Sequence, residues 1–250
     1  MSSFKDHFST QASGYARYRP GYPEALFAYL ASCCDAHDLA WDCGTGNGQA
    51  AHGLAHHFAR IIATDASADQ IAHAVPHERI AYHVAPAGQS SLTPGSADLV
   101  TVAQAIHWFD FDRFYAEVFR VLKPGGVLAV WTYSLMSATP AIDEVVYRYY
   151  ETIVGAYWPP ERRLVENAYR TIPFPFEEQQ TPAFHMDLTW SLDDVLGYLG
   201  TWSATARFAK AHRTDPVAHI RDDLAEAWGR LSDKKKIHWT LYLRVGRIPS

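Results

Sequence analysis

The stretch LAWDCGTGNGQAA combines an aspartate, three closely spaced glycines and a helical segment that follows them. A glycine turn between a strand and a helix brings backbone close to a ligand, and the positive N-terminal end of the helix favours an anionic group. Gly44, Gly46 and Gly48 follow the pattern GxGxG. A dinucleotide-binding turn would have its third glycine where Gln49 stands. The Asp42 carboxylate would repel a pyrophosphate but could accept hydrogen bonds from an amine, so the turn favours a ligand with both carboxylate and ammonium groups.

A second carboxylate, Asp65, lies 19 residues beyond Gly46, at the end of the next predicted strand. An acid in this position can take both hydroxyls of a ribose in a bidentate hydrogen bond. An amino-acid end together with a ribose end describes S-adenosylmethionine. The alternative is a surface turn with an incidental helix-capping aspartate. It is disfavoured because the glycine turn, the upstream acid and the downstream acid agree on one topology.

Methyl transfer from a sulfonium starts from an activated electrophile. The protein must therefore mainly align the nucleophile, exclude water and, for a hydroxyl or amine acceptor, remove a proton. A carboxylate acceptor needs no base. His107 follows the fourth predicted strand, at the sheet edge where open α/β proteins bind ligands, and is the candidate general base or substrate-orienting residue. The alternative is a structural histidine that supports the cofactor pocket together with Trp108.

The segments that carry these residues alternate between apolar runs and helical stretches. Strands are predicted at 39–43, 61–64, 80–85, 98–103 and 127–132, and helices at 24–31, 49–58, 68–74 and 111–122. This alternation implies right-handed βαβ crossovers and a mainly parallel sheet covered on both faces. Prolines interrupt residues 142–180, which predicts a helical or loop insertion. Two late apolar runs, 183–190 and 237–245, predict an antiparallel edge on the sheet.

Several of these stretches together resemble the signature motifs of class I S-adenosylmethionine-dependent methyltransferases. They are DCGTGNG, TDAS, DLVTVAQAIHWFD and RVLKPGG. The N-terminal F-x6-Y-x3-RPGYP and the tandem AIHWFD are similar to a branch that includes trans-aconitate-methyltransferase-like and cantharidin-methyltransferase-like proteins. The resemblance extends to TWSA and to the terminal LYLRVGR, so it covers nearly the whole chain. It implies an α/β, Rossmann-like, doubly wound sheet of seven strands, mainly parallel, with an antiparallel edge strand and a helical cap insertion.

Carried over by position, the resemblance also implies a set of residues around S-adenosylmethionine. From the methionine end through the ribose to the adenine and the sulfonium, these residues are Asp42, Gly44, Thr45, Gly46, Asp65, Ala66, Ala87, Gly88, Ala103 and Gln104. One departure concerns Gly88, because many relatives have an acidic residue there. An adenine hydrogen bond from that side chain is therefore absent, and backbone or a neighbour such as Gln89 could substitute.

The acceptor side of the site is expected from two regions. Tyr15, Arg17 and Arg19 lie in an N-terminal segment that in this family resembles a lid over the cofactor, and arginine suits bidentate binding of a carboxylate. The alternative for Arg17 and Arg19 is pairing with the protein's own acids. Trp202 and Arg207, from the second half, could line the far wall together with Trp108, although tryptophan is more often a core residue.

We expect a single methyltransferase domain over residues 1–250. Its expected segments are 1–35, an N-terminal lid and helix; 36–135, the cofactor-binding core; 136–182 and 191–235, cap or insertion elements; and 183–190 and 237–246, late strands. The 8 tryptophans, 14 tyrosines and 12 phenylalanines are dense in 147–158 and 174–202. Such density is consistent with an apolar substrate chamber, and would equally pack a helical cap.

Composition limits the other classes of function. A formal charge of −5 gives no electrostatic reason to bind nucleic acid or an anionic membrane, so the expected partner is a small molecule. Three cysteines without a disulfide or zinc pattern, and an N-terminus without an apolar core, favour a cytoplasmic location. His52 and His56 fall four apart on a predicted helix without a carboxylate or cysteine to complete a ligand set, so no metal is expected.

Two rival functions remain from the sequence. A nicotinamide oxidoreductase is opposed by Gln49 in place of the third glycine. A protein that binds S-adenosylmethionine without catalysis, or that serves as a partner subunit, would retain the same cofactor residues. The favoured reading is methyl transfer from S-adenosylmethionine, with S-adenosylhomocysteine as product, to a small-molecule acceptor whose methylated group is a carboxylate.

Overall fold

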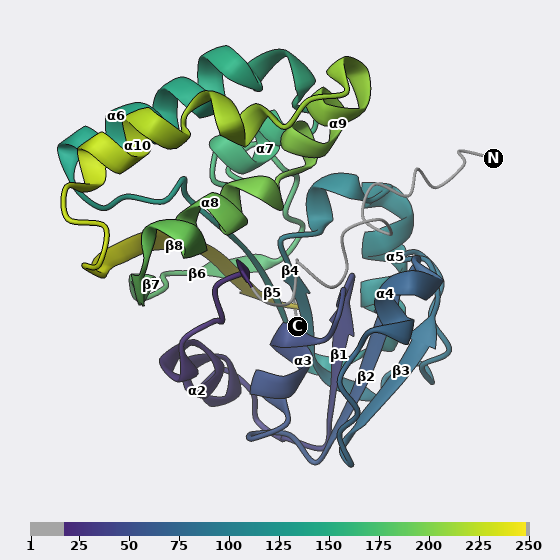
Figure 1. Ribbon diagram of the computed structural model, residues 1–250. Coiled ribbons are helices and arrows are strands. Elements are labelled where there is room, and N and C mark those ends of the chain that lie inside the picture. Colours follow the sequence, from purple (N-terminus) through teal and green to yellow (C-terminus); the bar gives the residue numbers. More distant parts are fainter. Residues whose placement is uncertain (1–17, 249–250) are drawn as a thin grey trace.

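The computed structural model describes residues 18–248, in which a mainly parallel sheet lies below a helical cap (Figure 1). The parallel part of the sheet has five strands: β1 (Leu39–Cys43), β2 (Arg60–Asp65), β3 (Ile80–Val84), β4 (Ala97–Ala103) and β5 (Leu122–Tyr133). Their order is β3-β2-β1-β4-β5, so the chain crosses from one half of the sheet to the other between β3 and β4. The carboxyl ends of β1 and β4 meet at this switch point, where open α/β sheets bind ligands.

The other edge of the sheet is antiparallel, as the two late apolar runs predict. β8 (Lys235–Arg247) pairs antiparallel with β5, and β6 (Glu177–Gln179) and β7 (Phe184–Trp190) both pair with the far side of β8. β6 and β7 occupy successive stretches of β8, separated by residues 180–183, which include Pro182. Proline has no backbone N–H to donate to a neighbouring strand, which fits the break in pairing at this point. Because β6 is a separate short strand, the sheet formed by the described residues has eight strands in place of the expected seven.

Helices cover both faces of the sheet and build the cap. On the sheet lie α2 (Glu24–Ser32), α3 (Gln49–Leu54), α4 (Ala68–Ala72) and α5 (Phe111–Val121), with the short η2 (Ile106–Trp108) before α5. The cap contains α6 (Pro140–Arg148), η3 (Tyr149–Ile153), η4 (Gly155–Tyr157), α7 (Arg162–Glu166), α8 (Leu192–Gly200), α9 (Ser203–His212), η5 (Pro216–His219) and α10 (Arg221–Trp228). Within residues 18–248, no helix is long and apolar enough to cross a membrane.

Side-chain alternation along the strands produces two hydrophobic cores. In β5, Val127, Ala129 and Trp131 belong to the core that includes α2, α3 and the cap. Leu128 and Val130 belong to the core on the opposite face, which includes α5. Because successive strand side chains point to opposite faces, a nearly continuous apolar run marks a strand covered on both sides. The doubly wound architecture expected from the sequence is confirmed.

Two helix boundaries differ from the sequence prediction. α3 ends at Leu54 and not at residue 58, because the N–H groups of His56 and His57 bond carbonyls three residues back, Gly53 and Leu54, and the chain turns at residues 55–57. α5 ends at Val121, and β5 begins at Leu122 and not at residue 127. Leu122 already pairs with Ala97, and the KPGG segment forms an irregularity within the strand pairing. A glycine-rich stretch can mark a bulge as well as a turn.

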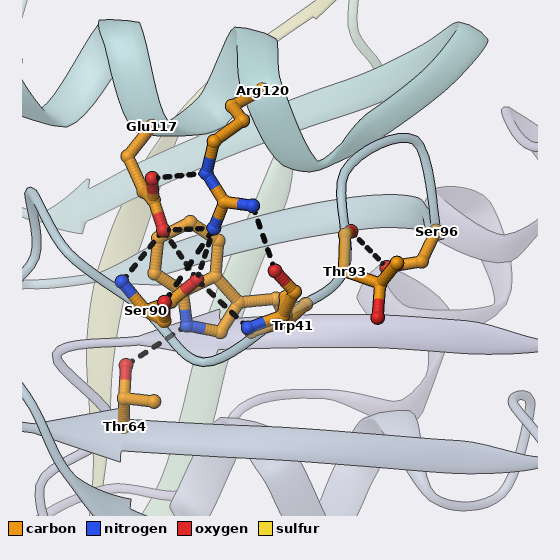
Figure 2. Close-up of polar contacts among 8 residues, drawn as sticks. Trp41, Thr64, Ser90, Thr93, Ser96, Glu117 and Arg120 are labelled. Atoms are coloured by element: carbon orange, nitrogen blue, oxygen red, sulfur yellow. Dashed lines mark hydrogen bonds and ion pairs between the residues drawn. The ribbon is translucent and has the colours of Figure 1, made fainter.

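A polar network fixes the loop between β3 and β4 (Figure 2). The buried Glu117 carboxylate accepts hydrogen bonds from the Ser90 N–H at 2.6 Å and from the Ser90 hydroxyl at 2.5 Å, and it pairs with Arg120 at 2.6 Å. Arg120 also donates to the Leu92 carbonyl at 2.8 Å. The Arg120 hydrogen bond is the main cause that lowers the pKa of Glu117 to about 2. The loop that carries Ala87 and Gly88 is thereby tied to α5.

Replacing Gly53 by alanine should destabilise the fold. A Cβ at Gly53 would lie 2.1 Å from the Phe27 ring, which is buried between α2 and α3. Overpacking of this kind costs about 1–3 kcal/mol, more than the roughly 1 kcal/mol that alanine gains over glycine in a helix. We expect the free energy of unfolding in urea to fall by up to about 2 kcal/mol. Gly200→Ala, another helical glycine with no atom within 4 Å of the added Cβ, is the control and should not be destabilised. Equal stability of both variants would contradict this account.

Candidate active site

The glycine turn after β1 adopts backbone conformations that favour glycine. Gly44, Gly46 and Gly48 have φ of 70°, 57° and 93°. A Cβ at Gly48 would lie 2.3 Å from the Tyr82 hydroxyl, whereas the nearest atom to a Cβ at Gly46 is 3.8 Å away. The turn is thus tightly packed behind Gly48 and open in front of Gly46, which leaves room for a ligand against the backbone.

Asp42 lies behind this turn. Its carboxylate accepts hydrogen bonds from the Thr45 hydroxyl at 2.5 Å and from the Thr101 hydroxyl at 2.8 Å. The side chain is fully buried, and this burial raises the pKa of Asp42 to about 6 although both hydroxyls favour the ionised form. In this arrangement Asp42 holds Thr45 and the turn. The amine contact expected from the sequence would have to reach a carboxylate that is already hydrogen-bonded twice.

Asp65, at the end of β2, lies on the ligand-facing side of the turn. One carboxylate oxygen accepts from the Gly46 N–H at 2.9 Å and the other from the Ser67 N–H at 2.8 Å. The Asp65 side chain remains partly exposed, as does Ala66 beside it. Although 19 residues separate Gly46 from Asp65, a direct hydrogen bond thus joins the turn to this acid.

The remaining rim residues lie at the ends of β3 and β4. A Cβ at Gly88 would lie 2.7 Å from the Cβ of Arg113 in α5, so a larger residue at this position would have to displace α5. This contact is a physical reason for the departure noted in the sequence. Gln104 follows Ala103 with φ of 55°, and its side-chain carbonyl accepts from the Thr132 hydroxyl at 2.7 Å.

Above Gln104 lies a partly open pocket between the sheet and the cap. Its main lining residues come from five separate parts of the chain: Arg19, Gln104, His107, Trp108, Tyr133, Trp158, Arg162, Tyr198 and Trp202. No aspartate or glutamate from residues 18–248 lines it. The pocket therefore has an aromatic surface with positive charge and no opposing carboxylate of its own.

The two arginines stand at the ends of a row of aromatic rings. The Arg162 guanidinium lies 4.6 Å from the Trp158 ring centre. The ring centres of Trp158 and Trp202 are 5.6 Å apart, and those of Trp202 and Tyr198 are 5.7 Å apart. At the far end, Arg19 lies 5.6 Å from the Tyr198 ring. The aromatic ring beside each guanidinium attracts its positive charge and restricts its orientation.

Within residues 18–248, both arginines donate hydrogen bonds to tyrosine hydroxyls, and Arg19 also donates to a backbone carbonyl. Arg19 donates to the Tyr133 hydroxyl at 2.8 Å and to the Thr201 carbonyl at 3.3 Å. Arg162 donates from Nε to the Tyr150 hydroxyl at 2.9 Å, and that hydroxyl in turn donates to the Glu166 carboxylate. Because Nε is occupied, the terminal Nη groups form the part of Arg162 that is suited to a bidentate contact.

His107 lies at the floor of the pocket between Trp108 and Tyr169. Its Nδ1 is 2.7 Å from the Tyr169 hydroxyl, and its ring centre is 4.8 Å from that of Trp108. Burial, assisted by the positive charge of Arg162, lowers the pKa of His107 to about 3. The imidazole is therefore neutral at physiological pH.

Comparison with known proteins assigns this arrangement to a family. A family model described as a methyltransferase domain matches residues 41–130. A candidate methyltransferase of Dictyostelium discoideum is 36% identical over 240 residues, covering 94% of this chain and 91% of the relative. The chain belongs to the class I S-adenosylmethionine-dependent methyltransferases. The structure of a candidate type II methyltransferase from Anaeromyxobacter dehalogenans matches this methyltransferase with a TM-score of 0.87 and 45% identity, over 93% of this chain and all of the other.

A more distant structure shares the fold of the methyltransferase. It is a phosphoethanolamine N-methyltransferase from Haemonchus contortus in complex with phosphomonomethylethanolamine and S-adenosylhomocysteine. The identity is 17% and the TM-score 0.50, over all of this chain and 61% of that one. At this identity the match shows the fold alone.

Only some of the residues predicted to contact the acceptor line the pocket. Arg19, Trp108 and Trp202 line the pocket, together with His107. Arg207 does not line it; its guanidinium lies 3.4 Å from the Tyr157 carbonyl. α9, which carries Arg207, packs against η4, and this packing directs the side chain away from the pocket. Tyr15 and Arg17 lie outside the described residues.

Sequence reasoning missed part of the pocket. Tyr133 and Arg162 line it but were not singled out, whereas Trp158 and Tyr198 lie in the two aromatic-dense stretches expected to form an apolar chamber or a cap. Trp158 and Arg162 lie within the proline-interrupted insertion, where neither periodicity nor a motif marks a site. A signal was nevertheless present in WPPERR, where an aromatic residue and a pair of arginines flank two prolines.

The neutrality of His107 should give the folded protein a pH-dependent stability. The native imidazole stays unprotonated down to about pH 3, whereas an unfolded histidine binds a proton below about pH 6.5. Between these two pH values the unfolded state therefore binds more protons than the native state. The contribution of His107 to the free energy of unfolding is thus fully present above pH 6.5 and is lost as the pH falls toward 3. The slope is at most about 1.4 kcal/mol per pH unit. Urea unfolding at pH 7.5, 6.5 and 5.5 measures this effect. As the pH falls, the free energy of unfolding should decrease less for His107→Asn than for the wild type.

The comparison has two built-in controls. Asp42, whose raised pKa acts in the opposite direction, is present in both proteins and cancels from their difference. His56→Asn removes an exposed imidazole and controls for the loss of a histidine as such. The account fails if the His107 variant and the wild type lose the same stability between pH 6.5 and 5.5.

Proposed function

We propose that this methyltransferase transfers a methyl group to a carboxylate oxygen of a small molecule with an apolar or aromatic body, bound in the pocket beneath the cap. The observation that carries the proposal is the pocket itself, in which the Arg162 guanidinium lies beside an aromatic wall that Arg19 also borders, and in which the lining residues from 18–248 include no carboxylate. The similarity of AIHWFD and the N-terminal motif to trans-aconitate-methyltransferase-like proteins supports a small-molecule acceptor. A concave, largely aromatic pocket between sheet and cap is also the kind of site that small ligands occupy.

The cofactor would be held at the rim of the sheet. We propose that Gly44, Thr45 and Gly46 face the amino-acid end of S-adenosylmethionine, where the open side of Gly46 leaves space for a ligand. Asp65 would bind the ribose hydroxyls through the acceptor capacity left on its two oxygens. Asp42 would act through Thr45 by fixing the turn.

The rest of the cofactor contacts would come from neighbouring loops. We propose that Ala66 flanks the adenine, that Ala87 and Gly88 approach its amino edge through backbone, and that Ala103 and Gln104 lie beneath the sulfonium. The Gly88 contact with Arg113 leaves no space for an acidic side chain, so backbone groups of this loop are the donors and acceptors available at the adenine edge. Bound S-adenosylmethionine supplies an electrophilic methyl group on a sulfonium.

A carboxylate acceptor fits the charges of the pocket and the state of His107. One carboxylate oxygen forms the new bond to the methyl carbon with its own lone pair, the carbon–sulfur electron pair stays on sulfur, and no proton moves. A base with a pKa of about 3 would be a weak proton acceptor for an alcohol. His107 is therefore assigned the orientation of the acceptor, while Arg19 and Arg162 bind its negative charge.

The test is methyl transfer from labelled S-adenosylmethionine to matched acceptors. Benzoic acid, benzyl alcohol and benzylamine, followed by their longer homologues, share an aromatic body and differ in the group that receives the methyl. We expect methyl esters from the acids, which base hydrolyses to methanol, and no product from the alcohols and amines. Transfer to alcohols or amines alone would overturn the carboxylate assignment. Binding of S-adenosylhomocysteine without transfer to any acceptor in a metabolite extract would favour the non-catalytic alternative.

A further inference from the structure

Tyr150 is a buried residue of the cap that contacts two of the residues lining the acceptor pocket. It is 7% exposed and does not line the pocket itself, whereas its neighbours Trp158 and Arg162 do. The Tyr150 ring packs against Trp158, with ring centres 5.0 Å apart, and edge-on against Trp202 at 5.9 Å. A residue in this position acts on a bound acceptor through its neighbours.

A π-helical turn brings Tyr150 to this position. α6 continues directly into η3, which has the wider hydrogen-bonding pattern of a π-helix. The Val154 N–H bonds the Tyr149 carbonyl at 3.0 Å, five residues back, whereas in an α-helix it would bond the Tyr150 carbonyl. The Tyr150 carbonyl instead accepts from the Trp158 indole N–H at 3.2 Å. Such turns are rare and occur frequently at functional sites, and this one ties the Tyr150 backbone to the wall of the pocket.

The Tyr150 hydroxyl connects Arg162 with Glu166. Arg162 donates from Nε to this hydroxyl at 2.9 Å, and the hydroxyl donates to the Glu166 carboxylate. These directions follow from the chemistry of the partners, because a guanidinium can only donate and an ionised carboxylate can only accept. Burial raises the pKa of Tyr150 to about 12, so the hydroxyl keeps its proton at physiological pH. The proton is thus directed to Glu166, and a lone pair of the hydroxyl faces the Arg162 Nε–H.

The Arg162 guanidinium is therefore oriented by a neutral group. Glu166 lies four residues after Arg162 on α7, a spacing that brings two side chains to the same face of a helix. Its carboxylate nevertheless bonds the Tyr150 hydroxyl, which lies between the acid and the guanidinium. On the other side, the guanidinium lies 4.6 Å from the Trp158 ring centre. One hydrogen bond and one ring thus restrict Arg162, and its Nη groups form the edge suited to a carboxylate.

We propose that Tyr150 is a positioning residue that holds the Arg162 guanidinium in the orientation that binds the acceptor carboxylate, so that the pocket prefers an acid over an uncharged molecule of the same shape. The proposal rests on the function proposed for this pocket and adds a residue that determines its specificity. Tyr150→Phe keeps the ring that packs against Trp158 and Trp202, and it keeps the carbonyl that holds the Trp158 indole. It removes only the hydroxyl, and so separates the orientation of Arg162 from the packing of the cap.

The orientation of Arg162 can be measured without any acceptor. In protein labelled with ¹⁵N at arginine Nε, the Arg162 signal is the one absent from Arg162→Lys. We expect the Arg162 Nε–H to exchange with water about three- to tenfold faster in Tyr150→Phe than in the wild type, the size of one hydrogen bond. Tyr149→Phe is the matched control, because it removes the hydroxyl of the neighbouring buried tyrosine, which bonds Thr205 at 2.8 Å and not Arg162. Equal exchange in the wild type and Tyr150→Phe, or equal acceleration in both tyrosine variants, would overturn the proposal.

The specificity is measured by binding, so that turnover is not required. In the presence of S-adenosylhomocysteine, benzoic acid and its longer homologues are titrated beside the corresponding amides. We expect an acid to bind the wild type more tightly than its amide, and this ratio of affinities to fall about three- to tenfold in Tyr150→Phe but not in Tyr149→Phe. The affinity of the amide should change little, because the hydroxyl acts on the charge-binding group.

Two outcomes of the binding experiment have different consequences. An unchanged ratio in Tyr150→Phe would overturn the role of Tyr150 in specificity. Failure of every acid to bind the wild type, together with faster exchange of the Arg162 Nε–H in Tyr150→Phe, would count against the proposed carboxylate acceptor alone.

Discussion

Asp65→Ala is expected to weaken the binding of S-adenosylhomocysteine by about 30- to 1,000-fold. The variant would remove the two charge-assisted hydrogen bonds that we propose Asp65 makes to the ribose, together worth roughly 2–4 kcal/mol. It also removes the acceptor of the Gly46 N–H at 2.9 Å, which holds the glycine turn against β2. Both effects act on the cofactor side, so the affinity for the acceptor should change much less. Isothermal titration calorimetry with S-adenosylhomocysteine measures the loss directly.

The interpretation of this result depends on matched variants. Asp69→Ala removes another carboxylate four residues further on, in the first turn of α4, and should bind S-adenosylhomocysteine like the wild type. Asp65→Asn keeps one acceptor oxygen and should fall between the wild type and the alanine variant. NAD, titrated in parallel, should not bind. Affinity of Asp65→Ala within threefold of the wild type would exclude Asp65 from the cofactor site.

The cofactor half of the molecule could be predicted because its determinants are local. The turn after β1 requires glycine at Gly44 and Gly48, where backbone angles and close neighbours exclude a side chain. The acid at Asp65 falls at a strand end whose position follows from an apolar run of four residues. Since each of these features lies within one βα unit, residue types and spacing were enough to place them.

The acceptor pocket could be predicted only in part because its determinants are not local. Arg162 comes from a five-residue helix in the insertion, and its neighbours Trp158 and Trp202 are brought together by packing of the cap. Arg207 has the same chemistry but a different orientation, since α9 packs against η4. Residue type alone could not distinguish the two arginines. The position of the Asp42 carboxylate behind the turn could not be predicted either, because it is hydrogen-bonded by Thr101 in a different strand.

The second large effect concerns Arg162. Arg162→Gln is expected to raise the KM for a carboxylate acceptor by about 30- to 1,000-fold while leaving the affinity for S-adenosylhomocysteine unchanged. An anion in the pocket would meet a guanidinium whose Nε is fixed by Tyr150 at 2.9 Å and whose plane lies near the Trp158 ring. Loss of a hydrogen-bonded charge partner in such a partly enclosed site costs roughly 2–4 kcal/mol. Initial rates at varied acceptor concentration, with saturating S-adenosylmethionine, measure the change.

A neighbouring residue supplies the control for Arg162. Arg163 belongs to the same helix but is exposed and does not line the pocket, so Arg163→Gln should keep the wild-type KM. A second readout separates charge from packing. The charge of Arg162 is one cause of the low pKa of His107, so Arg162→Gln should raise that pKa in an NMR titration, whereas Arg162→Lys should not. If Arg162→Gln raised the His107 pKa but left the acceptor KM at the wild-type value, Arg162 would act on the electrostatics of the pocket without binding the acceptor, and Arg19 would be the remaining guanidinium for the carboxylate.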